Sequence, residues 1–312
     1  MEALKATGLS KRYVWSGGSN QALKEVTLSV PTGSILGLIG RNGAGKTTFL
    51  RIASTSLLPT DGSMQILGHD VVDDSVAVRE RIAVIPQESR PFYWMNPREL
   101  IYYFLTMRGH TKADARTRAD EALAELGLTE YAGTLVSRLS GGLRRRAMVA
   151  MVMASDAEMV FLDEPTTGLD PLARRSVWEA IRKAAKANRT IFLTTHYLDE
   201  ADALSNRIAI LEKGKLLAEG PREAITAKVK HPYRVVVSDG FSRSELERYG
   251  EPIWLENRWL LLTGEREARE ISKMALERGA KLSLAPVSLE DIFMQIVGKD
   301  ISVDEAEADE GA

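Results

Sequence analysis

Cysteine is absent from this sequence of 312 residues, and the formal net charge is only −2. Without cysteine there are no disulfide bonds, thiolate zinc sites or cysteine nucleophile. The low net charge provides no basic field that would draw the chain to nucleic acid or anionic lipid. Long apolar runs are also missing, since segments such as Ala147–Ala154 fall far short of the roughly 20 residues that cross a bilayer. The polar start Met1–Lys5 does not fit a secretion signal, so a membrane role would need another chain to span the bilayer.

A glycine-rich loop follows the short apolar run Ser34–Ile39, which we expect to be a buried strand. The loop matches G-x-x-x-x-G-K-[ST] and consists of Gly40, Arg41, Asn42, Gly43, Ala44, Gly45, Lys46, Thr47 and Thr48. Its glycines let backbone N–H groups approach phosphate oxygens that a Cβ would obstruct. Lys46 is expected to reach the β- and γ-phosphates, Thr47 to hold Mg²⁺, and Thr48 to lie in the first helical turn. The loop predicts binding of a nucleoside triphosphate.

The apolar pattern predicts an α/β fold. Hydrophobic residues make up 44% of the chain, and its length allows two domains. Further buried strands are expected at Ile82–Ile85, Met159–Leu162 and Ile191–Thr194. A helix at Leu172–Ala187 separates the last two strands, which favours a mostly parallel sheet. Helical patterns between Gln87 and Ser140 interrupt this order and predict an inserted helical subdomain at about 88–155.

The pattern changes after Pro221. Residues 230–298 read as strand, helix, strand, strand, helix and strand, followed by a last helix. This is the order of a split βαβ, ferredoxin-like domain, and we expect a small α+β C-terminal domain. Residues 299–312 are acidic and small, which predicts a disordered tail.

Two adjacent carboxylates, Asp163 and Glu164, end an apolar strand. Side chains alternate along a strand, so the two groups can serve different purposes. Asp163 suits a partner of Mg²⁺, and Glu164 suits a general base that polarises the attacking water. Without the phosphate loop, a solvated strand end would be the simpler interpretation. With it, the pair predicts hydrolysis of the bound nucleotide.

A second anion site is predicted where Ser140, Gly141 and Gly142 precede an apolar helical run. On its own, Ser-Gly-Gly is more often a plain loop and N-cap. Beside a phosphate loop, it implies either two phosphates in one site or two chains that share a nucleotide.

The order of motifs resembles that of ABC ATPases over residues from about Leu4 to Arg222. The motifs are the phosphate loop, Gln87, Leu139–Gly142, Asp163–Glu164, Gly168–Pro171 and Thr195–His196. The resemblance implies an ATPase domain at 1–225, with a mostly parallel core sheet, an antiparallel β subdomain and an inserted helical subdomain. It also implies ATP and Mg²⁺ as cofactors, and a homodimer that encloses ATP between the phosphate loop of one chain and the signature Ser140–Gly142 of the other.

The resemblance assigns roles to further residues. Tyr13 matches the aromatic residue that stacks on adenine, with Trp15 as its rival. Gln87 matches the residue that reaches Mg²⁺ and water, and His196 the one that bonds the γ-phosphate. Asp170 matches the turn that crosses the dimer interface.

Three features bear on the partner and on the direction of transport. Leu143 replaces the glutamine of the commonest signature, as in members that pair with exporter-type permeases. Val287–Phe293 resembles the tail of antibiotic and sodium exporter ATPases. The aromatic cluster Phe92–Met95, unless it belongs to the subdomain core, suits an exposed groove near Gln87 for an integral membrane permease. We therefore expect an exporter ATPase on the cytoplasmic face of the membrane.

The main alternative is an ABC ATPase that acts on nucleic acid or ribosomes without a membrane partner. Such proteins usually carry two cassettes, long coiled coils or metal-binding cysteines, none of which the sequence contains. The net charge of −2 likewise gives no reason to expect nucleic acid as a partner. The C-terminal domain remains open to a regulatory role, a ligand-binding role or an added dimer contact.

Overall fold

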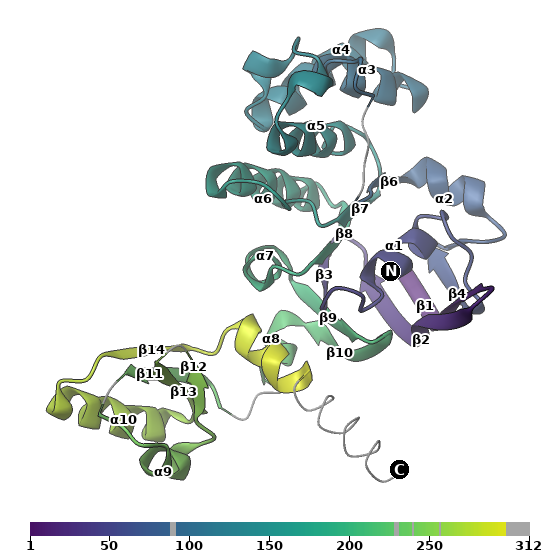
Figure 1. Cartoon of the computed structure of the whole chain (residues 1–312). Helices are drawn as coiled ribbons and strands as arrows, with labels where there is room; N and C mark the ends of the chain where they lie inside the picture. The colour runs from purple at the N-terminus through teal and green to yellow at the C-terminus, as the bar shows by residue number, and fades with distance from the viewer. Residues whose placement is uncertain (88–91, 228–230, 239, 256, 298–312) are drawn as a thin grey trace. The chain divides into compact units, whose positions relative to one another are not determined.

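The computed structural model describes the chain except for residues 88–91, 228–230, 239, 256 and 298–312 (Figure 1). The chain forms two compact units, Met1–Glu219 and Gly220–Ala312. The predicted acidic tail at 299–312 lies outside the described residues. Among the described residues, none of the helices combines the length and the apolar composition needed to traverse a bilayer.

A six-stranded sheet forms the centre of the first unit. Its order is β10 (Lys215–Pro221), β9 (Arg207–Glu212), β3 (Ile35–Ile39), β8 (Thr190–Thr195), β7 (Met159–Asp163) and β6 (Ile82–Ile85). The five strands from β9 to β6 pair in parallel, and every residue of β3, β7 and β8 is buried. Parallel strands covered on both faces read as continuous apolar runs, which is why the sequence identified them. The predicted α/β class with a mostly parallel sheet is confirmed.

A second, antiparallel sheet completes one side of this unit. It has the order β2 (Gly18–Pro31), β1 (Glu2–Trp15), β4 (Asp61–Ile66) and β5 (His69–Asp70). Helix α1 (Lys46–Ala53) belongs to the core between the two sheets, where Phe49 stacks on Phe192 of β8 with ring centroids 5.5 Å apart. The unit also contains α2 (Ser75–Arg81) and α7 (Leu198–Leu204).

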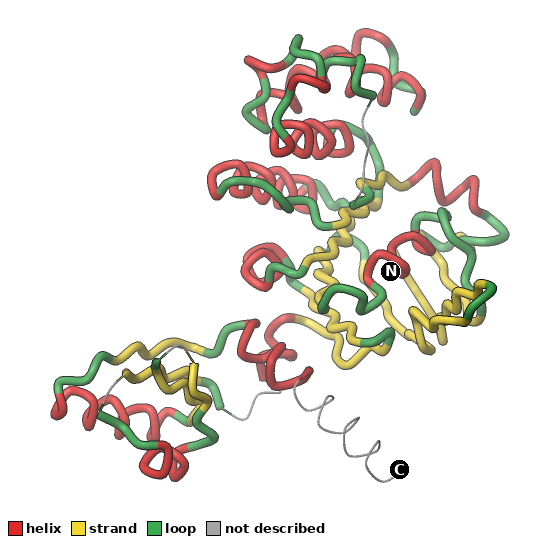
Figure 2. Tube along the Cα trace, viewed as in Figure 1, coloured by secondary structure: helices red, strands yellow, loops and turns green. Residues whose placement is uncertain are grey.

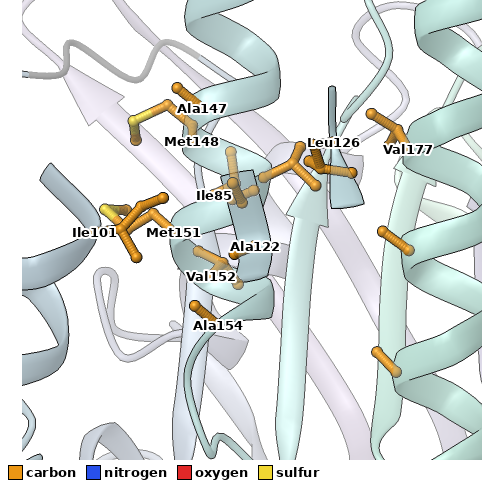
Figure 3. Close-up of a cluster of buried hydrophobic side chains, with 14 of the residues drawn as sticks. Ile85, Ile101, Ala122, Leu126, Ala147, Met148, Met151, Val152, Ala154 and Val177 are labelled. Atoms are coloured by element: carbon orange, nitrogen blue, oxygen red, sulfur yellow. The ribbon is translucent and has the colours of Figure 1, made fainter. Parts of the chain in front are cut away.

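The helices inserted between β6 and β7 are α3 (Pro97–Met107), α4 (Lys112–Glu125) and α5 (Gly141–Met153), with short 3-10 turns η1 (Thr129–Tyr131) and η2 (Val136–Arg138). Their starts are marked by Asn96, Thr111 and Ser140, each of which accepts a backbone N–H bond in the first turn. One buried apolar cluster joins α3, α4 and α5 to the strands and to α6 (Pro171–Lys186). Figure 3 shows this cluster around α5, with Ile101 of α3 on one side and Val177 of α6 on the other. Helix α5 contributes residues that pack on α3 and α4 and residues that pack on α6 and the strands. It therefore attaches the helical segment to the sheet.

The second unit contains a four-stranded antiparallel sheet in the order β12 (Ile253–Leu255), β13 (Arg258–Thr263), β11 (Tyr233–Ser238) and β14 (Leu282–Pro286). Helix α9 (Arg243–Leu246) with η3 (Glu247–Tyr249) follows β11, and α10 (Glu265–Arg278) precedes β14. Figure 2 shows α10 along one face of the sheet, where Ile271 and Ala275 pack with Val235 and Leu261. Helix α8 (Arg222–Ala227) opens the unit, and a last helix covers residues 289–297.

Candidate active site

The phosphate loop connects the end of β3 to the start of α1, as the sequence predicts. Its glycines are required by their surroundings. A Cβ on Gly40 would lie 2.2 Å from the carbonyl oxygen of Leu211, and one on Gly45 would lie 2.4 Å from that of Ala22. Gly43 and Gly45 also have φ angles of +84° and +107°, which favour glycine. The loop therefore exposes its backbone and the free N–H groups of α1 to an anion.

Lys46, the first residue of α1, is buried against this loop. Its Nζ donates hydrogen bonds to the carbonyl oxygens of Gly40 at 2.7 Å and Arg41 at 3.1 Å. Burial lowers the pKa of Lys46, and the nearby carboxylates of Glu164 and Asp163 oppose that shift. The ammonium group thus lies between the phosphate loop and the carboxylates at the end of β7.

The next two residues of α1 connect the loop to other predicted site residues. The Oγ1 of Thr47 lies 3.5 Å from the Oε1 of Gln87, and the Oγ1 of Thr48 lies 3.3 Å from the hydroxyl of Tyr13. The ring of Tyr13 is half-buried, with the Nζ of Lys11 5.6 Å from its centroid. Trp15 is 55% exposed and lies against the hairpin glycines. The hydrogen bond between Tyr13 and Thr48 places the ring of Tyr13 next to the phosphate loop, where an adenine ring could stack on it.

Asp163 and Glu164 occupy the end of β7 and the residue after it. The carboxylate of Asp163 is buried, and its Oδ1 accepts a hydrogen bond from the hydroxyl of Thr194 in the neighbouring strand β8. Its Oδ2 is also buried and has no hydrogen-bond partner among the described residues. Glu164 adopts the left-handed conformation, with φ at +51°. Its backbone N–H donates to the carbonyl oxygen of Thr194 at 3.0 Å and to the hydroxyl of the same residue at 3.2 Å.

The carboxylate of Glu164 is contacted by side chains that follow the ends of other strands. The Nδ1 of His196, after β8, lies 2.9 Å from its Oε1. The Nε2 of Gln87, after β6, donates to its Oε2 at 3.2 Å, and the hydroxyl of Thr167 donates to the same oxygen at 3.2 Å. The structure thus brings together Gln87, Glu164 and His196, which are three of the predicted site residues. Thr167 was not predicted as a site residue, although its position three residues after Glu164 in a turn was a usable signal.

The signature residues form a separate part of the site. Ser140 caps α5 and accepts the backbone N–H of Leu143 at 3.2 Å. Gly141 has open space at its Cβ position, and a Cβ on Gly142 would lie 3.4 Å from the Cδ2 of Leu169. Within the described part of the chain, no hydrogen bond or ion pair joins Ser140–Gly142 to the phosphate loop.

Asp170 caps α6 and accepts the backbone N–H groups of Leu172 at 3.0 Å and Ala173 at 2.9 Å. The bond from Ala173 is the main cause that lowers the pKa of the Asp170 carboxyl. The carboxylate therefore fixes the turn between β7 and α6.

A hollow of about 340 Å³ lies beside the start of α5 and the residues that follow β6 and β7. It is lined by Gln87, Tyr93, Gly141, Arg144, Arg145, Met148, Glu164, Thr167 and Gly168. Arg145 was not identified from the sequence, where it stands in a run of three arginines that suggests an exposed basic face.

Comparisons with known proteins identify the family of this chain. A family model described as "ABC transporter" matches residues 23–167. The daunorubicin/doxorubicin resistance ATP-binding protein DrrA of Streptomyces peucetius is 34% identical, and the match covers 99% of this chain and 97% of that protein. The Nod factor export ATP-binding protein I of Cupriavidus metallidurans is 31% identical, with 91% of this chain and 95% of that protein covered.

Solved structures share this fold over about 70% of the chain. An ATP-binding subunit of an ABC transporter has a TM-score of 0.66 and 26% identity, and the match covers 72% of this chain and 92% of that one. A dimeric ATP-binding cassette bound to ADP and Pi has a TM-score of 0.65, with 24% identity and 70% of this chain covered. Because relatives named as ATP-binding proteins match over almost the whole length of both chains, this chain belongs to the ATP-binding subunits of ABC transporters and is an ATPase.

Proposed function

We propose that this chain is the ATP-hydrolysing subunit of an exporter and that it drives transport through separate membrane subunits. The observation that carries the proposal is the near-complete match to relatives named for drug resistance and for Nod factor export. These matches include the C-terminal unit as well as the ATPase fold. They favour an exporter over an ABC ATPase that acts on nucleic acid or ribosomes.

The site residues have distinct roles in this proposal. Backbone N–H groups of Gly40–Thr48 hold the phosphates, Lys46 neutralises the β- and γ-phosphates, and Tyr13 stacks on adenine. Glu164 is the general base that takes a proton from the attacking water. His196 and Gln87 contact the two oxygens of the Glu164 carboxylate and orient it. His196 is also proposed to bond the γ-phosphate.

A Mg²⁺ ion fits the residues beside the phosphate loop. Thr47, Gln87 and Asp163 offer a hydroxyl, an amide oxygen and a carboxylate, which are hard oxygen ligands of the kind that Mg²⁺ prefers. The buried Oδ2 of Asp163 has no hydrogen-bond partner among the described residues and could face the ion or one of its waters. The ion would neutralise charge on the β- and γ-phosphates.

We further propose that two copies of the chain enclose ATP. Ser140 presents the N-terminus of α5 without a hydrogen bond to the chain's own phosphate loop within the described residues. Each chain would therefore contribute its signature, with Gly141, Gly142 and the turn at Asp170, to the nucleotide held by its partner. Binding of ATP then closes the dimer, and hydrolysis at Glu164 releases it.

The permease is proposed to dock at the segment Phe92–Met95, close to Gln87. Phe92, Tyr93 and Trp94 are 48%, 42% and 69% exposed, which is unusual for aromatic side chains so close together. The same segment is bonded to the residues before the signature, since Val136 donates to the carbonyl oxygen of Met95 at 2.8 Å. A docked partner would thus contact a segment that reaches the signature through backbone hydrogen bonds.

Residues 230–298 are proposed to be an accessory domain, added to an ATPase domain at 1–225 whose helical subdomain covers about 88–155. In the structure, the four strands of the accessory domain have the order β12-β13-β11-β14 around its own apolar core. It would regulate the ATPase or add a contact to the dimer.

Docking can be tested with the double variant Phe92→Ala/Trp94→Ala, co-expressed with a permease of the type expected from a neighbouring gene. The variant should lose co-purification with that permease and transport in cells, while the isolated chain keeps its ATPase activity. The matched control is Met107→Ala, because Met107 is 75% exposed on α3 of the same helical segment. Retention of the permease by the double variant, or co-purification of the wild type with nucleic acid instead, would contradict the proposal.

A further inference from the structure

The side chain of Arg145 connects the signature helix to both catalytic strand ends. Its guanidinium donates hydrogen bonds to the backbone carbonyl oxygens of Pro86, Gln87, Asp163, Glu164 and Pro165. The Nη1 lies 3.1 Å from the oxygen of Pro86, and the Nη2 lies 2.9 Å from that of Glu164. The five donors of a guanidinium form a rigid planar fork, so one side chain can bond the ends of β6 and β7 together.

Its sequence neighbours do not share this position. Arg144 lies over the ring of Tyr93, 5.8 Å from its centroid. Arg146 donates to the carbonyl oxygen of Leu126 at 3.1 Å, within the helical segment. Burial lowers the pKa of Arg145, and the nearby carboxylates of Asp163 and Glu164 oppose this, so the group stays charged at neutral pH. Its positive charge is thus close to the proposed general base.

The contact matters most for the backbone of Glu164. A non-glycine residue in the left-handed region is strained, and it persists only where surrounding contacts determine it strongly. Thr194 binds the N–H of Glu164, and Arg145 binds its carbonyl oxygen. The two contacts hold the strained residue from both sides and so set the direction in which its carboxylate leaves the strand.

We propose that Arg145 is a positioning residue for ATP hydrolysis: it holds Glu164 in its reactive conformation and makes that conformation depend on the position of α5. Because Ser140 caps the same helix five residues earlier, capture of a partner's nucleotide at the signature would be transmitted to Glu164 through Arg145. This step rests on the proposed dimer and on the proposed role of Glu164.

The test compares three variants of the full chain. Arg145→Gln removes the fork, and Arg145→Lys keeps the charge but not the geometry. The matched control is Arg189→Gln, because Arg189 is another half-buried arginine that bonds backbone carbonyls, at Met153 and Ser155, at the opposite end of α5. Its pKa is likewise lowered by burial. The measurements are kcat and KM for ATP, together with the Tm of each variant.

Arg145→Gln should lower kcat by about 10- to 100-fold with little change in KM, because a misplaced catalytic group slows the chemical step. Arg145→Lys should fold and give an intermediate kcat, whereas Arg189→Gln should lower Tm and keep kcat. In the background of Glu164→Gln, the Arg145→Gln change should cause little further loss, since residues that act as a unit are not additive.

The proposal is overturned if Arg145→Gln or Arg145→Lys keeps the wild-type kcat, if only KM rises, or if the losses of Arg145→Gln and Glu164→Gln add fully. Should Arg145→Gln not fold, the kcat of Arg145→Lys decides the question. The wild type and Glu164→Gln in the same assay separate this inference from the proposed function. A fully active Glu164→Gln would remove the general base itself, whereas an inactive Glu164→Gln beside a fully active Arg145→Gln would remove only the positioning role.

Discussion

The variant Thr194→Val tests how Thr194 holds the buried carboxylate of Asp163 and the strained backbone of Glu164 at the end of β7. The hydroxyl of Thr194 is fully buried, donates to Asp163 and accepts from the N–H of Glu164. Valine has nearly the same shape but no hydroxyl. The carboxylate of Asp163 would then lose the hydrogen bond to its Oδ1, while its Oδ2 already lacks a partner among the described residues.

The expected loss follows from these contacts. A hydrogen bond to a charged group contributes about 1.5–3 kcal/mol to the free energy of unfolding. The first unit has the size at which 1 kcal/mol shifts Tm by roughly 2–4 °C, so a loss of about 2 kcal/mol lowers Tm by roughly 4–8 °C. The value of kcat should fall as well, because the N–H of Glu164 keeps only its bond to the carbonyl oxygen of Thr194.

Chemical denaturation and steady-state ATPase assays measure both effects. The control is Thr190→Val at the other end of β8, where the buried hydroxyl accepts the backbone N–H of Gly33 at 3.0 Å. The control should lose about 1 kcal/mol and keep kcat. A Thr194→Val variant that is as stable and as active as the control would refute this role of the Thr194 hydroxyl.

Two more predictions concern other buried charges. Lys46→Ala should weaken ATP binding at least about tenfold in calorimetry. The control Lys183→Ala, which removes an exposed lysine of α6, should leave the affinity for ATP unchanged. Equal affinities of both variants would contradict the assignment of the phosphate loop. Burial raises the pKa of Glu200, although bonds from Thr195, Thr166 and Trp178 oppose the shift. A raised pKa stabilises the fold at low pH, and this contribution is lost as pH rises through the folded-state pKa. The free energy of unfolding of Glu200→Gln should therefore rise relative to that of the wild type between pH 4 and pH 8. A difference between the two proteins that stays constant over this range would refute the prediction.

The sequence predicted the elements that have a strong local signal. Buried parallel strands such as β3 and β7 are continuous apolar runs, and the phosphate loop has a fixed spacing that ends at a helix. Convergence of Gln87, Glu164 and His196 could be expected once the motifs were placed at the carboxyl ends of parallel strands.

The missed residues act through tertiary contacts. Thr194 reads as one more residue of an apolar strand, and only its register next to Asp163 gives its hydroxyl a role. Arg145 looks like part of a solvated basic run, because nothing local shows that its side chain reaches Pro86 and Glu164, which are 59 and 19 residues away in the sequence. Glu200 likewise gave no signal, since Thr166 and Trp178 come from separate segments.

In the proposed cycle, ATP assembles two chains around a site that neither completes alone. Glu164→Gln separates ATP-driven assembly from hydrolysis, because the amide keeps the size of the side chain and removes the base. Its kcat should fall by about 10²- to 10⁴-fold. In sedimentation velocity with ATP, the variant should form a dimer that the additional change Lys46→Ala abolishes. A Glu164→Gln variant that stays monomeric with saturating ATP would contradict the proposed assembly. Equal dimerisation with and without the additional change Lys46→Ala would contradict it as well.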